Sequence, residues 1–261
     1  MEALISIITA TYNSEKTISK TLESLINQSS KDFEFIIIDG DSRDDTLAII
    51  EEYEPEFRNK GIKFSWISEK DSGIYDAWNK GLNLANGEWI SFLGSDDIMM
   101  PEAINTYSQI ALKESSRQID LIHSKVEVIR DDKVIKIIDG KWSWKIFKNQ
   151  MNIAHVGALH NRSYFKKYGV FDESYKITGD YELLLRARHG LKCLYIDELT
   201  AQMAYGGIST TNVKKVFLET LRAKKETGKA NEMICWFDFY IASFKHKIKM
   251  SLLQFNKMKN H

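Results

Sequence analysis

The first hundred residues alternate between short apolar runs and longer segments with helical periodicity. The apolar runs cover residues 4–10, 33–39, 62–68 and 88–94, and each has the length and composition of a buried strand. Between them, amphipathic segments predict helices over 15–28, from Thr46 to about Tyr53, and over 72–85. Because strand and helix alternate strictly, we expect right-handed crossovers and a parallel sheet with helices on both faces.

The pattern changes after residue 101. We expect a helix over 101–116, a hairpin over 120–139 that turns at Asp131-Asp132, a Trp-rich loop over 141–150, a helix through 181–190 and a short strand over 193–197. The last 50 residues have a helical pattern and are both basic and aromatic. We therefore predict an α/β domain over 1–210, with halves of about 1–100 and 101–210, and a helical tail over 211–261.

Charge is distributed unevenly along the 261 residues, although the formal net charge is zero. Residues 214–261 contain 11 Lys and Arg against 4 Asp and Glu, whereas the rest of the chain contains 25 against 32. A neutral chain of this kind does not predict a nucleic-acid partner. The basic, aromatic tail is typical of a helix at a membrane interface, but also of a helix that packs on the α/β domain or on a second subunit of a homodimer.

Only Cys193 and Cys235 are present, which is too few for a disulfide framework, and their spacing is not that of a metal site. The N-terminal residues do not have the basic region and cleavage site of a signal peptide. No apolar run approaches the roughly 20 residues that cross a bilayer. These features predict a cytoplasmic protein, with the inner face of the membrane as an alternative location.

Acidic residues follow three of the four predicted strands of the first half. The strand ends are residues 9–13, 39–42, 69–71 and 95–97. In an open parallel sheet, ligands bind beyond these carboxyl ends. No glycine-rich phosphate loop is present, so an acidic rim accepts a diphosphate only with a divalent cation, Mg²⁺ or Mn²⁺, between them. Asp96 and Asp97 either cap the next helix or end a strand at such a metal–diphosphate site, and the neighbouring strand ends favour the second reading.

Four motifs occur in the order SIITATYNSEKTISKTLESLINQ, FEFIIIDGDSRDDT, EKDSGIYDAWNKGLNLANGEWISFLGSDD and KITGDYELLLR. Together, over roughly residues 4 to 210, they resemble family 2 glycosyltransferases, which have the GT-A fold: a Rossmann-like, mostly parallel sheet flanked by helices. The form EKDSGIYDAWNKG is similar to the branch that builds bacterial capsule, O-antigen and exopolysaccharide. The resemblance implies a metal-dependent hexosyl- or N-acetylhexosaminyltransferase. Such an enzyme moves a sugar, with inversion, from a nucleotide-diphosphate donor, expected to be a UDP-sugar, to a glycan or lipid-linked acceptor.

The resemblance also implies roles for individual residues. The implied donor-binding residues are Thr9, Ala10, Tyr12, Asn13, Asp39, Asp41, Asp71, Lys80, Ser95 and Asp96, and the implied metal ligand is Asp97. Lys80 is equally typical of a solvated helix lysine. In many family members a second Asp follows the one after the second strand and pairs with uracil, but Gly40 stands at that position here. The base contact would then fall to Asp39, Asp41 or a backbone group.

The acceptor side is implied by the later motifs. Asp180 in TGDYELLLR falls where the family has its general base, at the start of a helix, although a helix cap would look the same. His155 resembles a residue that lines the acceptor side, whereas His160 is more typical of a packed core histidine. Residues 206–210 predict either a loop that closes over the donor or a simple turn.

Two other functions are compatible with the sheet alone. A non-catalytic module that binds nucleotide sugars would keep the fold, but it would not need a base at Asp180. A nucleotidyltransferase would need a glycine-rich, basic loop after the first strand, and ATYNSEKT is not such a loop. The sequence therefore favours the transferase.

Overall fold

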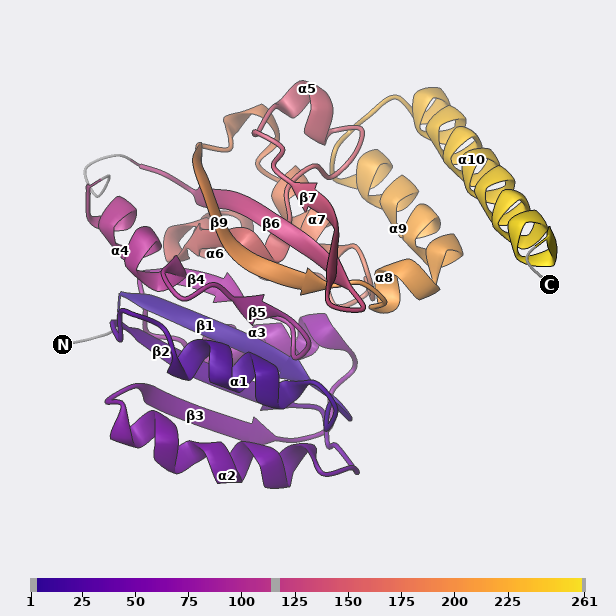
Figure 1. Cartoon of the computed structure of the whole chain (residues 1–261). Coiled ribbons are helices and arrows are strands. Elements are labelled where there is room, and N and C mark those ends of the chain that lie inside the picture. The colour runs from indigo at the N-terminus through magenta and orange to yellow at the C-terminus, as the bar shows by residue number, and fades with distance from the viewer. Residues whose placement is uncertain (1–3, 114–117, 260–261) are drawn as a thin grey trace.

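One sheet of nine strands runs through the computed structural model, which describes residues 4–113 and 118–259 (Figure 1). The strand order is β3-β2-β1-β4-β8-β6-β9-β5, and β7 pairs with β6. The first four strands of this order lie within residues 5–92, and the others lie within residues 98–204. The join between β4 and β8 therefore brings the two halves into one continuous sheet.

The first half is the parallel part that the sequence predicts. Its strands are β1 (Ile5–Thr11), β2 (Phe33–Asp39), β3 (Lys63–Ser68) and β4 (Trp89–Phe92), and its helices are α1 (Ile18–Ile26), α2 (Thr46–Asn59) and α3 (Ile74–Leu84). The pairs β1–β2, β1–β4 and β2–β3 are all parallel, as predicted. Helix α2 continues through Pro55 to Asn59, six residues beyond its predicted end at Tyr53.

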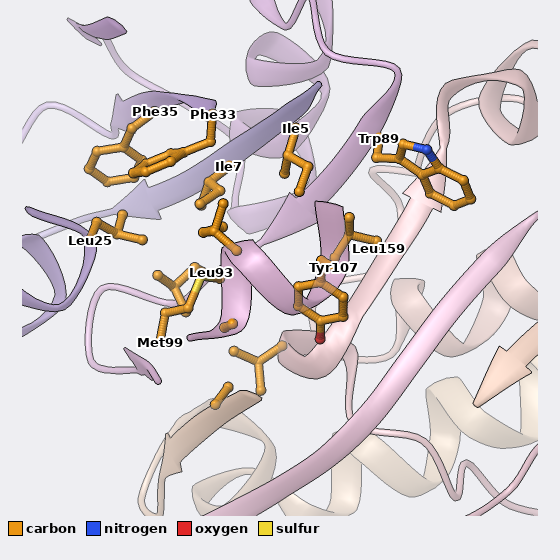
Figure 2. Packing of buried hydrophobic residues seen from close by; sticks show 14 of the residues in the cluster. Ile5, Ile7, Leu25, Phe33, Phe35, Trp89, Leu93, Met99, Tyr107 and Leu159 are labelled. Carbon is orange, nitrogen blue, oxygen red and sulfur yellow. The ribbon is translucent and has the colours of Figure 1, made fainter. Parts of the chain in front are cut away.

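Alternate residues of β1 enter different cores because side chains of a strand point to opposite faces. Ile5 and Ile7 pack in the cluster that contains Leu22 and Leu25 of α1, and Figure 2 shows Ile5 and Ile7 near Leu25, Phe33 and Phe35. Ile8 faces the other way and packs with Trp78 of α3. Both faces of these strands are thus covered, which is why they read as continuous apolar runs.

The second half is mixed rather than parallel. Its elements are β5 (Ile98–Met99), α4 (Ala103–Lys113), β6 (Leu121–Arg130), β7 (Lys133–Ile138), α5 (Trp144–Phe147), η1 (His155–Gly157), β8 (Ala158–Asn161), α6 (Arg162–Tyr168), α7 (Gly179–Leu185), η2 (Arg188–Gly190) and β9 (Cys193–Ala204). The predicted hairpin turns at Asp131 and Asp132, which have φ angles of 49° and 55°. Residues 114–116 of the predicted helix over 101–116 lie outside the described residues.

Two expectations for this half need correction, and two short strands of this half were not expected. Strand β9 has 12 residues instead of the five over 193–197, because its second part pairs with β6 and β5 across a register shift. The short strands β5 and β8 are not signalled by any apolar run of ordinary length. The Trp-rich segment 141–150 contains the one-turn helix α5.

The tail forms three helices, α8 (Ile208–Thr211), α9 (Val213–Glu226) and α10 (Glu232–Lys259). Helix α9 packs against α7, and α10 packs against α9, at the edge of the molecule remote from α2 (Figure 1). Helix α8 overlaps residues 206–210, for which the sequence predicts either a loop or a turn. Among the described residues, none of the helices combines the length and apolarity that crossing a membrane requires.

Candidate active site

A cavity of about 1750 Å³ opens at the carboxyl ends of the parallel strands. Its walls come from both halves of the sheet and from the tail. Of the residues singled out in the sequence, those that line it are Ala10, Tyr12, Asn13, Asp71, Ser95, Asp96, Asp97, His155 and Asp180. The topology therefore brings the acidic strand ends and the TGDYELLLR motif to one place, although Asp71 and Asp180 are 109 residues apart in the sequence.

The loops after β1 and β2 are tied together by the side chains of Asn13 and Ser42. The Asn13 backbone N–H donates to Ser42 Oγ at 2.8 Å, and the Arg43 N–H donates to Asn13 Oδ1 at 2.9 Å. Asn13 has φ 49°, a left-handed conformation that Asn adopts more readily than most residues. This double link orients the cavity wall at Asn13 and brings Arg43, which the sequence reasoning missed, into the lining.

Asp96 and Asp97 form a tight turn directly after β4. Asp97 Oδ2 accepts a hydrogen bond from the Gly94 N–H at 3.2 Å, and Oδ1 accepts one from the Ala204 N–H at 3.0 Å. A Cβ on Gly94 would meet Asp97 Oδ2 at 2.6 Å and Asp96 Oδ1 at 2.9 Å, so only glycine leaves room for both carboxylates. Burial, with the charge of Asp96 as a second cause, raises the pKa of Asp97 to about 7, and burial also raises the pKa of Asp96.

This pair fits a divalent cation by its chemistry. Among the side chains that the structure describes, no Lys or Arg forms an ion pair with either carboxylate, so neither is neutralised by a salt bridge from them. The described residues contain no group of three or more His, Cys, Asp or Glu side chains that could hold a metal by themselves. Mg²⁺ and Mn²⁺ sites often use one or two carboxylates and leave the other positions to phosphate and water. Two carboxylates therefore fit such an ion when a diphosphate completes the site.

Asp180 lies in the first turn of α7 and also lines the cavity. Thr178 occupies the N-cap position, so Asp180 is not the cap itself. Asp180 Oδ1 accepts hydrogen bonds from the Tyr181 N–H at 2.8 Å and from the Tyr75 hydroxyl at 3.4 Å. Burial raises the pKa of Asp180 to about 6, although these two hydrogen bonds lower it. A carboxylate with a pKa near neutrality can take a proton during a reaction.

Four of the residues implied by the resemblance lie outside the cavity lining. Thr9 and Asp39 are buried at the strand ends, and Asp39 accepts hydrogen bonds from Ser42 and Ser68. Asp41 is exposed, with φ 66°. Lys80 pairs with Glu69 at 2.9 Å and donates to the Lys70 carbonyl.

Gly40 and Asp71 are in close contact at the rim. A Cβ on Gly40 would lie 2.6 Å from Asp71 Oδ2, so the Asp71 carboxylate uses the space beside the missing side chain. Asp71 Oδ1 accepts a hydrogen bond from the Gly73 N–H at 2.9 Å, which holds the carboxylate at the cavity. An acid from the end of β3 thus lies where a second Asp after β2 would otherwise point.

His155, in the cavity lining, and His160, in the core, are in contact with their rings tilted by 58°. Their ring centroids are 4.9 Å apart, and burial lowers the pKa of both, that of His160 to about 3. His160 is fully buried, in agreement with its assignment to the core. His155 lines the cavity and packs on Trp78 and Phe92, so it presents a neutral ring there.

The tail supplies a wall that the sequence reasoning missed. The lining includes Val216, Leu221 and Lys224 of α9 and Phe239, Ala242 and Lys245 of α10. The composition of the tail was visible in the sequence, but no motif signalled that it faces Asp180. Tyr75 was also missed, although it lies inside the EKDSGIYDAWNKG motif.

Comparison with known proteins shows what the chain is similar to. The family model of glycosyl transferase family 2 matches residues 6–118. A PGL/p-HBAD biosynthesis glycosyltransferase of Mycobacterium bovis is 28% identical over 232 residues, which cover 86% of each chain. The structure of S. aureus TarS 1–349 in complex with UDP-GlcNAc superimposes with a TM-score of 0.65 at 22% identity, over 90% of this chain and 69% of that one.

A mannosyltransferase from Pyrobaculum calidifontis, in complex with GDP-Man and Mn²⁺, gives a TM-score of 0.62 at 15% identity, over 88% of this chain and 66% of that one. These two structures show that the chain has the GT-A fold. The match to the family 2 model and the similarity to these relatives support a family 2 glycosyltransferase.

Proposed function

We propose that the protein transfers a sugar, with inversion at the anomeric carbon, from a UDP-sugar to a glycan or lipid-linked acceptor of bacterial surface polysaccharide synthesis. The observation that carries the proposal is the meeting of Asp96, Asp97 and Asp180 at one cavity. The first two come from the end of β4 and the third from α7, so the cavity has separate anionic walls. One wall suits a donor diphosphate with its cation, and the other suits an attacking hydroxyl.

In the proposed reaction, Asp180 removes the proton of the acceptor hydroxyl as that oxygen attacks the anomeric carbon. The Tyr75 hydroxyl and the Tyr181 N–H both contact Oδ1 of Asp180, and neither contact uses Oδ2. Oδ2 therefore remains for the proton. A Mn²⁺ or Mg²⁺ ion bound by Asp97, with Asp96 beside it, would neutralise the charge of the leaving diphosphate.

For the donor base, we propose Asp71 as the acidic contact in place of the residue missing at Gly40. Asp39 is already engaged by Ser42 and Ser68, and Asp41 lies outside the cavity lining. Asp71 lines the cavity and lies against Gly40. Ala10, Tyr12 and Asn13 would form the wall beside the base and ribose.

Thermal unfolding with UDP-, GDP- and dTDP-sugars, each with and without Mn²⁺, tests the donor. A ligand at 100 times its dissociation constant stabilises the folded state by about 2.7 kcal/mol, which is measurable as a rise in Tm. We expect the largest rise with a UDP-sugar and Mn²⁺ together. Release of UDP on incubation separates the transferase from a module that only binds nucleotide sugars, since binding alone releases none. No shift with any of these donors would contradict the proposal.

We also propose that α10 contacts an anionic bilayer surface. Met233, Phe237, Tyr240, Phe244 and Ile248 recur at intervals of three or four residues, so they share one helix face. Their side chains are between 45% and 80% exposed. The opposite face packs on α9 through the buried Cys235 and through an ion pair of Asp238 with Lys224 at 3.0 Å. An apolar face on a basic segment matches the charge of an anionic lipid surface.

Flotation with vesicles tests this contact. The protein should float with phosphatidylcholine–phosphatidylserine vesicles at low salt and less at high salt, because each basic residue near the surface contributes about 1 kcal/mol of attraction that salt screens. The double variant Phe237→Ser, Phe244→Ser should stay unbound, whereas Val134→Ser, at an exposed position of β7, should float normally. No flotation at low salt refutes the contact. A dimer in light scattering that the double variant abolishes would assign the face to a second copy instead.

A further inference from the structure

Four consecutive backbone N–H groups precede or begin α7 and cannot bond within the helix. The N–H groups of Lys176, Ile177 and Thr178 donate to the carboxylate of Glu219, at 3.0, 2.9 and 3.0 Å. The fourth, that of Gly179, donates to the Tyr75 hydroxyl at 2.7 Å. Asp180 is the next residue. Its backbone position is therefore determined by one carboxylate from α9 and one phenol from α3.

Glu219 is built into the fold rather than solvated. Its side chain is 10% exposed, and its nearest cation, Lys215 Nζ, lies 4.0 Å away. A buried carboxylate is costly unless it is hydrogen-bonded, and three N–H groups from one loop meet that need. Glu219 lies beyond residues 6–118, which the family model matches, so no motif assigns it a role.

Other contacts fasten α9 to the same segment. Arg222 stacks over the ring of Tyr175 with its guanidinium carbon 4.3 Å from the centroid. Thr227 Oγ1 donates to Glu182 Oε1 at 2.8 Å. The anchor of residues 176–178 thus belongs to a longer contact between α9 and residues 175–182.

We propose that Glu219 is a positioning residue of the transfer reaction, which holds Asp180 at the acceptor side by binding the three N–H groups before it. The inference rests on the proposed role of Asp180 as the base. Glu219 does not line the cavity, so it acts through the loop and not by touching substrate. A misplacement of about 1 Å can cost on the order of 10²-fold in rate. Loss of this anchor should therefore lower kcat and leave donor binding unchanged.

The groups that face Asp180 give a second readout. Tyr75 from α3 donates to it, Tyr181 of α7 donates its N–H, and Glu219 of α9 adds a negative charge that raises the pKa of Asp180. Removing the charge of Glu219 should move the acid limb of the pH–rate profile to lower pH. Removing the Tyr75 hydroxyl should move it to higher pH, because that hydrogen bond lowers the pKa of Asp180.

Steady-state kinetics of Glu219→Gln, Glu219→Asp and Tyr75→Phe test the inference, with Glu232→Gln, an exposed Glu of the same tail, as the matched control. We expect kcat to fall about ten- to a hundredfold in both Glu219 variants, which is the order of the loss that a shift of about 1 Å causes. The donor KM should stay within about twofold of wild type. The acid limb should shift down in Glu219→Gln and up in Tyr75→Phe. Glu219→Asp keeps the charge but shortens the reach, so it remains informative if Glu219→Gln does not fold.

Two outcomes would overturn the inference, and they are distinguishable. If Asp180→Asn abolishes transfer but both Glu219 variants behave like Glu232→Gln, Glu219 has no positioning role. If Asp180→Asn transfers sugar at the wild-type rate, the proposed base is wrong and the inference falls with it. The inference is supported if kcat falls with an unchanged donor KM and if the acid limb shifts down in Glu219→Gln and up in Tyr75→Phe.

Discussion

The substitution Asp180→Asn should abolish transfer and at the same time stabilise the protein above pH 6. Asparagine keeps the shape of the side chain and can still accept the Tyr181 N–H and the Tyr75 hydroxyl. It cannot take up the acceptor proton, and loss of a general base typically lowers the rate by about 10²–10⁴-fold. The stability gain follows from the cost of keeping a carboxylate ionised at this position.

The magnitude comes from the raised pKa of Asp180, which is about 6 in the folded protein against an ordinary value of 3.8. This difference corresponds to about 3 kcal/mol if the carboxyl were fully shielded. Asp180 is partly exposed at the cavity wall, so solvent reduces the gain to about 1–3 kcal/mol. Because the folded-state pKa of Asp180 is raised, its carboxyl costs the wild type no stability below pH 4. The cost grows as the pH rises from 4 to 6 and has its full value above pH 6. The variant has no such cost.

The assay compares the Tm of wild type and Asp180→Asn between pH 4 and pH 8. The two should coincide near pH 4, and the variant should unfold several degrees higher at pH 8, given about 2–4 °C per kcal/mol for a chain of this size. In parallel, kcat of the wild type at pH 5 should be about a tenth of its plateau, since only about a tenth of a group with a pKa of 6 is ionised there. A variant that is equally or less stable at pH 8 would refute the reasoning and leave Asp180 as a carboxylate that stabilises the start of α7.

Three further predictions concern the donor wall and the core. Asp97→Asn should abolish the increase in UDP affinity that Mn²⁺ causes in isothermal titration, since one of few carboxylate ligands is lost; an unchanged increase would remove Asp97 from the metal site. Gly40→Ala should raise the donor KM about tenfold, or about 1.4 kcal/mol, because the new Cβ would lie 2.6 Å from Asp71 Oδ2; an unchanged KM would separate Asp71 from donor binding. Tyr107→Phe should lower stability by about 1–3 kcal/mol, because its buried hydroxyl bonds Ser124, Thr200 and the Gly157 carbonyl, whereas Tyr240→Phe at an exposed position should not; equal denaturation midpoints would refute this.

Most of the first half of the fold follows from the sequence because its signals are local. The strands β1 and β2 are buried on both faces, so each is mostly apolar, and the helix α1 between them is amphipathic. The hairpin at Asp131 and Asp132 is equally local, since the turn needs two residues that tolerate positive φ. Strand β8 is different. Its four residues pair with β4 and β6 by contacts between distant segments, and nothing within the run itself signals a strand.

Figure 2 shows why such segments are set by the tertiary structure. Leu159 of β8 lies near Tyr107 of α4 and Trp89 of β4, although it is 52 and 70 residues from them in the chain. The same distinction holds for the candidate site. Asp97 and Asp180 could be predicted from the sequence because each lies in a motif. The contact of Glu219 with residues 176–178 joins segments about 40 residues apart, and no motif marks it.

The carboxylates of this chain are held in two physically different ways. Burial opposes ionisation of Glu34 in the core, but Lys63 at 2.8 Å and hydrogen bonds from Ser6 and Asn86 lower its pKa to about 2. The charge of the Glu34 carboxylate is thus balanced by Lys63, and this carboxylate has a structural role.

Asp97 and Asp180 are instead held by uncharged donors, the N–H groups of Gly94, Ala204 and Tyr181 and the hydroxyl of Tyr75. Amide and hydroxyl dipoles fix the direction of a carboxylate without cancelling its charge. Burial raises the pKa of these two to about 7 and about 6, although the hydrogen bonds lower it in part. A lysine at either position would lower that pKa, as Lys63 does for Glu34, and would make the oxygen a weaker ligand for a cation and a weaker acceptor for a proton. The use of neutral donors at both walls is therefore what the proposed chemistry requires of this cavity.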